Sequence, residues 1–128
     1  MSEIPSELRY SFAHTWIALQ DDDTVKVGIT DHAQQELGDI IYVELPETEK
    51  NYSYGDECAV VESVKSASDI YCPLTGEVTL VNTELEGNPE IINTDPYGDG
   101  WIFVMVPDDI SEVDELLDAD SYREKIEE

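Results

Sequence analysis

The stretch Val61-Glu-Ser-Val-Lys65-Ser-Ala-Ser-Asp69-Ile70, followed by Pro73 and Gly76, determines the fold prediction. It lies in an interval between Gly55 and Gly76 that contains no other glycine. One arm of this interval reads Cys-Ala-Val-Val-Glu-Ser-Val and the other Ser-Ala-Ser-Asp-Ile-Tyr-Cys, with a single lysine between them. Two such arms predict a β-hairpin that presents Lys65 near its turn.

Lysine is scarce in this chain of 128 residues, in which 31 Asp and Glu outnumber 6 Lys and Arg. Three lysines have structural explanations, in a predicted strand, a polar loop and the last predicted helix: Lys26, Lys50 and Lys125. Lys65 has none, and Glu62 and Asp69 flank it. It is either a solvated lysine that balances nearby acids or an ε-amine offered to another enzyme for acylation.

Short β-prone segments separated by turn formers continue along the rest of the chain. They cover residues 25–29, 40–45, 58–64, 77–81 and 101–106, a spacing typical of an all-β sandwich or barrel. Helices are predicted over 31–38 with Asp31 as N-cap and Gly38 as the stop, over 111–117 with Ser111 as N-cap, over 120–128 and, more weakly, over 82–87. We therefore expect one domain, 1–128, with a core at about 8–107 and a C-terminal helical appendage at about 111–128.

The net charge of −25 excludes several classes of function. Such a field repels phosphate backbones and anionic headgroups, so we expect no binding to nucleic acid or to membranes. The first residues lack the basic and apolar pattern of a signal peptide, which predicts a cytoplasmic protein. The charge also favours a monomer, and it has two interpretations: general acidity, or halophilic adaptation to molar salt, where the Debye length is about 3 Å.

Cys58 and Cys72 lie seven residues on either side of Lys65. A two-residue turn would place Cys58 opposite Tyr71 and point the other thiol away, so we expect two buried free thiols. With His14 and His32 they lack the spacing of zinc ligands, and no metal site is predicted. No nucleophile elbow, phosphate loop or acid–base constellation is present, so no catalytic residues are predicted.

The residues around Lys65 resemble the attachment motif of lipoyl domains. Biotin carriers usually place methionine on both sides of the lysine, where this chain has Val64 and Ser66. Four further segments resemble the H proteins of the glycine cleavage system: Val27-Gly-Ile-Thr-Asp-His-Ala-Gln34, Leu37-Gly-Asp-Ile40, Tyr42-Val-Glu-Leu-Pro46 and Asp95-Pro-Tyr-Gly-Asp-Gly-Trp101. The resemblance covers roughly residues 8–123.

This resemblance implies a mainly β fold, the lipoyl/biotinyl-type barrel-sandwich hybrid of two antiparallel sheets with a few short helices. It implies a carrier and not an enzyme, with lipoate bound covalently to Lys65 as N6-lipoyllysine. The carrier would take the aminomethyl group of glycine from a pyridoxal-phosphate glycine decarboxylase to a tetrahydrofolate-dependent aminomethyltransferase, and dihydrolipoyl dehydrogenase would reoxidise it. A lipoate ligase or a lipoyl/octanoyl transferase would attach the cofactor. Glu62 and Asp69 match motif positions and are candidates for enzyme recognition or arm positioning, or are solvated acids.

One segment departs from the family pattern. The family usually reads Ser-His-Glu-Trp near its N-terminus, and the Glu helps to line the cleft that shelters the loaded arm. This chain reads Ala13-His14-Thr15-Trp16. Either another acid substitutes or the loaded arm is less protected. Two alternatives to the glycine cleavage carrier are an H-like relay that passes lipoyl groups to other complexes and an unmodified interaction module.

Overall fold

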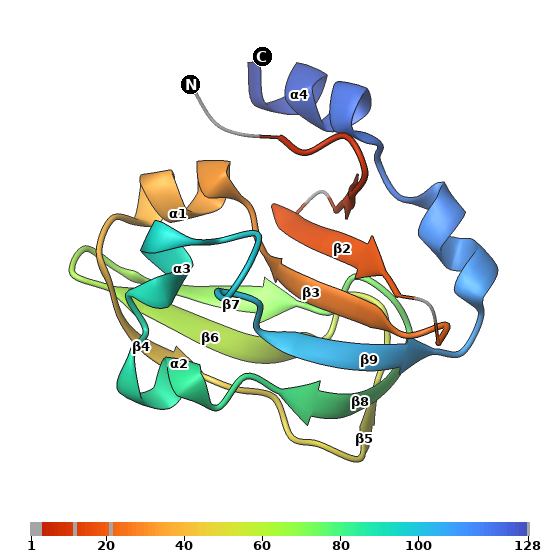
Figure 1. Ribbon diagram of the computed structural model, residues 1–128, viewed down its shortest axis with the longest axis horizontal. Helices are drawn as coiled ribbons and strands as arrows, with labels where there is room; N and C mark the ends of the chain where they lie inside the picture. Colours follow the sequence, from red (N-terminus) through yellow and green to blue (C-terminus); the bar gives the residue numbers. More distant parts are fainter. Residues whose placement is uncertain (1–3, 12, 21, 128) are drawn as a thin grey trace.

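The computed structural model describes residues 4–11, 13–20 and 22–127, and these form two antiparallel sheets with short helices (Figure 1). In this part of the chain the larger sheet has the strand order β1 (Arg9–Tyr10), β2 (Thr15–Leu19), β3 (Val25–Ile29), β9 (Phe103–Pro107), β8 (Gly76–Val81) and β5 (Lys50–Tyr52). The smaller sheet has the order β4 (Ile40–Glu44), β6 (Glu57–Ser63) and β7 (Ala67–Tyr71). The predicted mainly β fold of two antiparallel sheets is confirmed.

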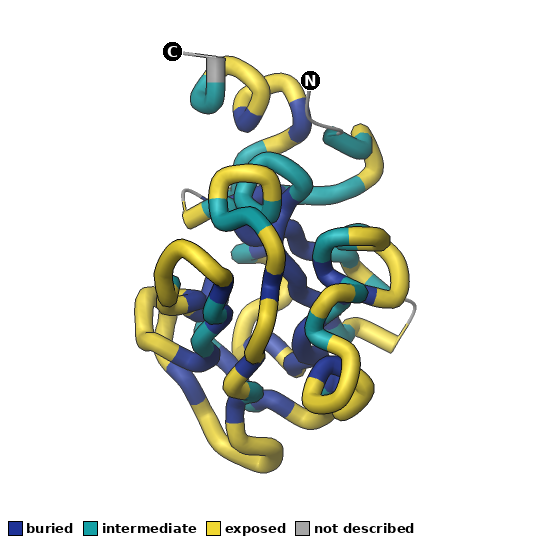
Figure 2. Tube along the Cα trace, turned by 90° about the vertical axis from the view of Figure 1, so that its left-hand side faces the viewer, coloured by how far each residue is buried: buried dark blue, intermediate teal, exposed yellow. Residues whose placement is uncertain are grey.

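Alternating side chains of the two sheets form the core. Val25, Val27 and Ile29 alternate along β3 and are buried, and they share one apolar cluster with Val61 and Ile70 of the smaller sheet. Figure 2 shows the buried segments in the interior and the exposed loops around them. Burial of such β-branched side chains, at about 25 cal/mol per Å² of apolar surface, holds the sheets face to face.

Five short helical segments cover the edges and ends of the sheets within the described residues: α1 (Asp31–Leu37), α2 (Glu84–Gly87), α3 (Ile91–Thr94), the 3₁₀ helix η1 (Ile110–Glu115) and α4 (Ala119–Glu127). Helix α4 docks through Tyr122, which stacks on Tyr10 with ring centroids 4.7 Å apart. None of these helices is long and apolar enough to cross a membrane.

Two predicted helix caps are wrong by one or two residues. The N-cap of α1 is Thr30 and not Asp31, because the Thr30 hydroxyl accepts the amide proton of Ala33. The N-cap of the next helical segment is Asp109 and not Ser111, because the Asp109 carboxylate accepts the Ser111 amide proton. This segment, Ile110–Glu115, is a 3₁₀ helix. The end of α1 at Gly38 is confirmed, since this residue has a φ of 84°.

The base of the β6–β7 hairpin contains a β-bulge that the sequence did not indicate. Glu57 pairs with Tyr71 and Ala59 with Ile70, so that Cys58 is the extra residue. The expected pairing of Cys58 with Tyr71 is therefore wrong, whereas both thiols are buried as predicted. A hydrogen bond with Cys72, together with burial, raises the pKa of Cys58 far above its ordinary value. Both cysteines are free, as predicted.

Candidate functional site

The hairpin turn at Lys65 is organised by one buried hydroxyl. Ser63 and Ser66 close the turn through a backbone hydrogen bond of 2.8 Å, which leaves Val64 and Lys65 as the two turn residues. The Ser63 Oγ accepts the amide protons of Lys65 and Ser66 at 3.2 and 3.1 Å. It also donates to the Ser66 carbonyl at 3.1 Å. The backbone that carries Lys65 is thus fixed, while its side chain is exposed.

The turn rests on the loop that joins α1 to β4. The amide of Val64 donates to the carbonyl of Asp39 at 3.1 Å. The Cε of Lys65 lies 3.2 Å from the position that a Cβ on Gly38 would take. In Figure 1 the loop between β6 and β7 accordingly lies beside the chain that leaves α1. This contact between residues far apart in the sequence holds the hairpin tip in one place.

Lys65 differs from the other lysines in its surroundings. Lys26 lies over the ring of Trp101 at 5.3 Å from its centroid. Lys50 pairs with Glu47 at 3.5 Å and lies over a tyrosine ring. In the part of the chain that the structure describes, no ion pair or ring engages the ammonium of Lys65. Its amine is therefore free to react with an acyl donor.

The two acids that the sequence singled out lie on neighbouring strands. Glu62 is half-buried on β6 and pairs with Ala67 of β7. Asp69 is exposed on β7 and pairs with Val60. Within the described residues neither forms an ion pair with Lys65. The structure thus brings both acids to the lysine hairpin, and Asp69 also borders a cleft.

This cleft, of about 150 Å³, lies between α1 and β7. Ten residues line it, from the segment before β2, from the end of β3, from α1 and from β7: Ala13, His14, Ile29, His32, Ala33, Glu36, Leu37, Ser68, Asp69 and Ile70. Its two carboxylates belong to Glu36 and Asp69. The cleft combines an apolar wall with two anionic groups, which suits a ligand with an apolar chain and a cationic end.

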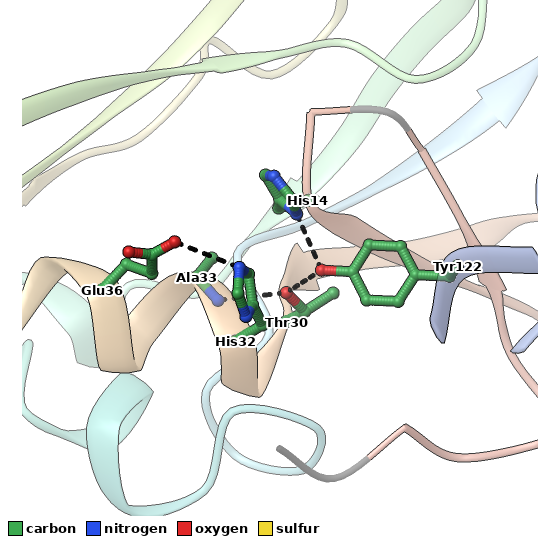
Figure 3. A network of polar contacts seen from close by, with 6 residues as sticks. All are labelled: His14, Thr30, His32, Ala33, Glu36 and Tyr122. Carbon is green, nitrogen blue, oxygen red and sulfur yellow. Dashed lines mark hydrogen bonds and ion pairs between the residues drawn. The ribbon is translucent and has the colours of Figure 1, made fainter. Parts of the chain in front are cut away.

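A chain of polar contacts runs from His14, which lines the cleft, to Tyr122 and Thr30 (Figure 3). The Tyr122 hydroxyl lies 2.8 Å from Nδ1 of His14 and 2.7 Å from Oγ1 of Thr30. Burial, with Lys125 and His32 nearby, lowers the pKa of His14. With the proton of neutral His14 on Nε2, Tyr122 donates to Nδ1 and accepts from Thr30; with that proton on Nδ1, both directions reverse. Burial raises the pKa of Tyr122 to about 12, so its hydroxyl keeps the proton that this arrangement requires.

A separate pair of contacts ties His32 into α1. Its Nε2 lies 3.1 Å from the Glu36 carboxylate, one helical turn away, and its ring lies 5.1 Å from that of His14. Glu36, which lines the cleft, is thus held by His32. Sequence reasoning did not select this residue, because an acid in a short helix carries no signal of the cleft beside it.

Ala13 and Thr15, the two residues that depart from the family pattern, have no carboxylate. Ala13 lines the cleft, but Thr15 is fully buried and its hydroxyl bonds that of Ser11. Glu36 and Asp69 are therefore the acids that the cleft does offer.

Comparisons with known proteins agree with this architecture. The family model described as glycine cleavage H-protein matches residues 8–128. The glycine cleavage system H protein of Psychrobacter sp. (strain PRwf-1) is 56% identical over 126 residues, which are 98% of this chain and 100% of that protein. The one from Shewanella loihica is 55% identical over 128 residues, 100% of this chain and 99% of that protein.

A crystal structure of a glycine cleavage system H protein from Mycobacterium marinum superposes on the chain with a TM-score of 0.88 at 39% identity, covering 98% of this chain and 100% of that one. The fold and the sequence therefore agree over nearly the full length. The chain belongs to the glycine cleavage H-protein family.

Proposed function

We propose that Lys65 is the residue to which lipoate is attached, as an amide on its Nζ. The observation that carries this proposal is the position of Lys65 at a hydrogen-bonded two-residue turn, where its amine is exposed and engaged by no described acid or ring. A tip of this kind fits into another enzyme's active site without unfolding of the hairpin. The Ser63 hydroxyl keeps the turn in one conformation for that encounter.

As a member of its family, the chain is a lipoyl carrier of the glycine cleavage system, moving the aminomethyl group, and is not itself an enzyme. The bound lipoyl group supplies a disulfide that accepts the aminomethyl group of glycine and is later restored by oxidation. The residues of the chain hold the hairpin, keep the lysine accessible and provide a cleft beside it. Tethering also raises the effective concentration of the group at each docked enzyme.

The enzymes that use the arm are, in this proposal, the pyridoxal-phosphate glycine decarboxylase, the tetrahydrofolate-dependent aminomethyltransferase and dihydrolipoyl dehydrogenase. A lipoate ligase or a lipoyl/octanoyl transferase attaches the cofactor. Glu62 and Asp69 extend an acidic surface on both sides of the hairpin tip and serve in recognition by the attaching enzyme. Glu62→Gln and Asp69→Asn should each raise the KM for attachment, whereas Glu77→Gln, on β8 of the other sheet, should not.

The cleft between α1 and β7 shelters the loaded arm in this proposal. The aminomethyl group is cationic at neutral pH, and the Glu36 and Asp69 carboxylates lie at the cleft. Glu36 replaces the carboxylate that is absent at Thr15. Glu36→Gln should therefore accelerate loss of the aminomethyl group from the loaded carrier, measured as formaldehyde or ammonia released. Equal rates for the variant and the unchanged protein would exclude Glu36 from this role.

Intact mass and peptide mapping test the attachment itself, on protein from its native host grown with lipoate. One lipoyl amide on Lys65, absent from Lys65→Arg, is the expected result. An unmodified Lys65 would leave an interaction module on a lipoyl-type fold. A lipoylated chain that fails to support glycine-dependent carbon dioxide exchange with the purified enzymes would instead be a relay.

We also propose that the protein is a cytoplasmic monomer adapted to high salt, folded as one domain with a core at about 8–107 and an appendage at about 111–128. The two buried free thiols are consistent with a reducing compartment. The net charge of −25 disfavours self-association and is screened only at high ionic strength.

A further inference from the structure

The side chain of Lys65 lies across a glycine. A Cβ built on Gly38 would lie 3.2 Å from Cε and 3.9 Å from Nζ of Lys65, and within the described residues no other atom of the fold lies within 4 Å of it, apart from the residues adjoining Gly38 and the backbone of α1. Because a contact of 3.2 Å is tighter than an ordinary van der Waals contact, the end of the Lys65 side chain would have to shift by a few tenths of an ångström beside any other residue at position 38. The backbone at Gly38, which carries no side chain, is therefore the surface beside which the end of the Lys65 side chain lies.

Asn93, from α3, holds this surface in place. Its Nδ2 donates to the Gly38 carbonyl at 2.9 Å and to Oε1 of Gln34 at 2.8 Å. Its Oδ1 accepts the amide proton of Ile40 at 2.8 Å. The amide group thus binds the chain before, at and after the α1 terminus, and it uses both of its donor protons and its acceptor oxygen.

The hairpin is joined to the same loop by a second connection. The Val64 amide donates to the Asp39 carbonyl, and Asp39 lies between Gly38 and Ile40, both of which Asn93 binds. Lys65 follows Val64 directly. Its backbone is therefore joined, through Val64, to the segment that Asn93 fixes, and its side chain lies beside that same segment. A free lysine samples many rotamers, whereas one that rests on a fixed surface samples fewer.

We propose that Gly38 and Asn93 are positioning residues for the acylation of Lys65. This rests on the proposed attachment of lipoate to Lys65. In the reaction the deprotonated amine attacks the carbonyl carbon of an activated lipoyl donor, an acyl adenylate; the new C–N bond forms, the acyl–oxygen bond breaks, AMP departs and the amine gives up a proton to solvent. Gly38 directs the amine, and Asn93 keeps Gly38 and the hairpin tip in register.

Gly55 provides a matched control for Gly38. Both glycines have a positive φ, 84° and 87°, so that alanine is strained at each. A Cβ at Gly55 meets nothing within 4 Å, whereas one at Gly38 meets Lys65. Comparing Gly38→Ala with Gly55→Ala therefore separates the lysine contact from the strain.

The experiment follows lipoylation by intact mass, with a lipoate ligase, lipoate and ATP, and determines kcat and KM. Gly38→Ala should lower kcat/KM about tenfold, as expected for a misplaced nucleophile, and Gly55→Ala should leave it within about twofold. The melting temperature of each variant, measured alongside, gives the strain that the alanine introduces. In the unchanged protein, NMR should also show an NOE between the Lys65 Hε and Gly38 Hα protons.

Asn93→Asp and Asn82→Asp form a second pair. Each substitution removes two side-chain donor protons. Asn82→Asp is the control, because Asn82 donates to the carbonyls of Asp99 and Trp101 and not to the loop beside Lys65. Only Asn93→Asp should slow lipoylation, beyond what its loss of stability accounts for.

The outcomes distinguish the proposed attachment of lipoate to Lys65 from the proposed positioning role of Gly38 and Asn93. If unchanged protein is acylated at Lys65 and Gly38→Ala reacts as fast as Gly55→Ala, or faster, the positioning role is wrong and the attachment site stands. If unchanged protein is not acylated at Lys65, both are wrong.

Discussion

The Tyr122 hydroxyl lies 2.7 Å from Oγ1 of Thr30, across 92 residues of sequence. Thr30 is the N-cap of α1, and Tyr122 belongs to the C-terminal helix. This one contact therefore joins the last helix of the chain to the short helix whose other end supports the lysine hairpin.

Removing that hydroxyl should destabilise the fold measurably. Tyr122→Phe leaves the Thr30 hydroxyl and Nδ1 of His14 without their shared contact in a buried position, which should lower the free energy of unfolding by about 1–3 kcal/mol. Urea denaturation measures this loss. Tyr54→Phe, at a residue that is 64% exposed, should change stability by less than about 0.5 kcal/mol. Equal effects of the two variants would contradict the assigned network.

His14 should make stability depend on pH near neutrality. Its pKa in the folded protein is lowered from the ordinary 6.5, first by burial and then by Lys125 and His32, while Glu36 opposes the shift. The folded state thus binds fewer protons, and stability is fully present above pH 6.5 and decreases as the pH falls below it. The contribution of the hydrogen-bonded Asp109 and Asp118, whose pKa values are also lowered, is lost only below their ordinary 3.8.

Denaturation between about pH 7.5 and about pH 5 should therefore show a slope that His14→Asn reduces. An unchanged slope in this variant would show that His14 does not titrate differently in the folded and unfolded states.

Gly28 should not tolerate a side chain. A Cβ there would lie 2.7 Å from the ring of Trp16, whose Nε1 donates to the Pro96 carbonyl at 2.8 Å. Gly28→Ala should cost about 1–3 kcal/mol through overpacking, with a change in tryptophan fluorescence. Gly87→Ala meets nothing within 4 Å and lies in α2, so it should be neutral or stabilising by up to about 1 kcal/mol. A fully stable Gly28→Ala would mean that Trp16 moves without cost.

Salt should stabilise the protein if the acidic surface reflects salt adaptation. The melting temperature should rise from low to molar KCl, since repulsion among the 31 acids is then screened. Identical melting temperatures across this range would leave the charge as general acidity.

The sequence predicted the strand at Val25–Ile29 with its observed bounds, because alternating valines and isoleucine indicate one buried face. It also predicted the Lys65 turn. It missed β5, since Lys50–Tyr52 lies in a polar segment and pairs with one strand only. The Thr30 cap could not be distinguished from Asp31, because Thr and Asp are both common N-caps and the contact of the Thr30 hydroxyl with Tyr122 depends on a distant helix.

The surroundings of Lys65 were predicted only in part. Glu62 and Asp69 are near it in sequence and could be named. Gly38 was recognised as a helix stop, but its contact with Lys65 depends on how α1 packs beside the hairpin. The bulge at Cys58 likewise has no signal in the sequence, because Cys58–Val61 is a continuous apolar run in which no alternation marks the extra residue.

The burial of both cysteines has an analytical consequence. The sequence contains no others, so the folded polypeptide presents almost no sulfhydryl to a colorimetric thiol reagent. After mild reduction and removal of the reductant, the reagent would titrate the two sulfurs of the lipoyl arm against a nearly blank background. Two thiol equivalents per chain would indicate complete lipoylation, and a lower value would give the lipoylated fraction without mass spectrometry.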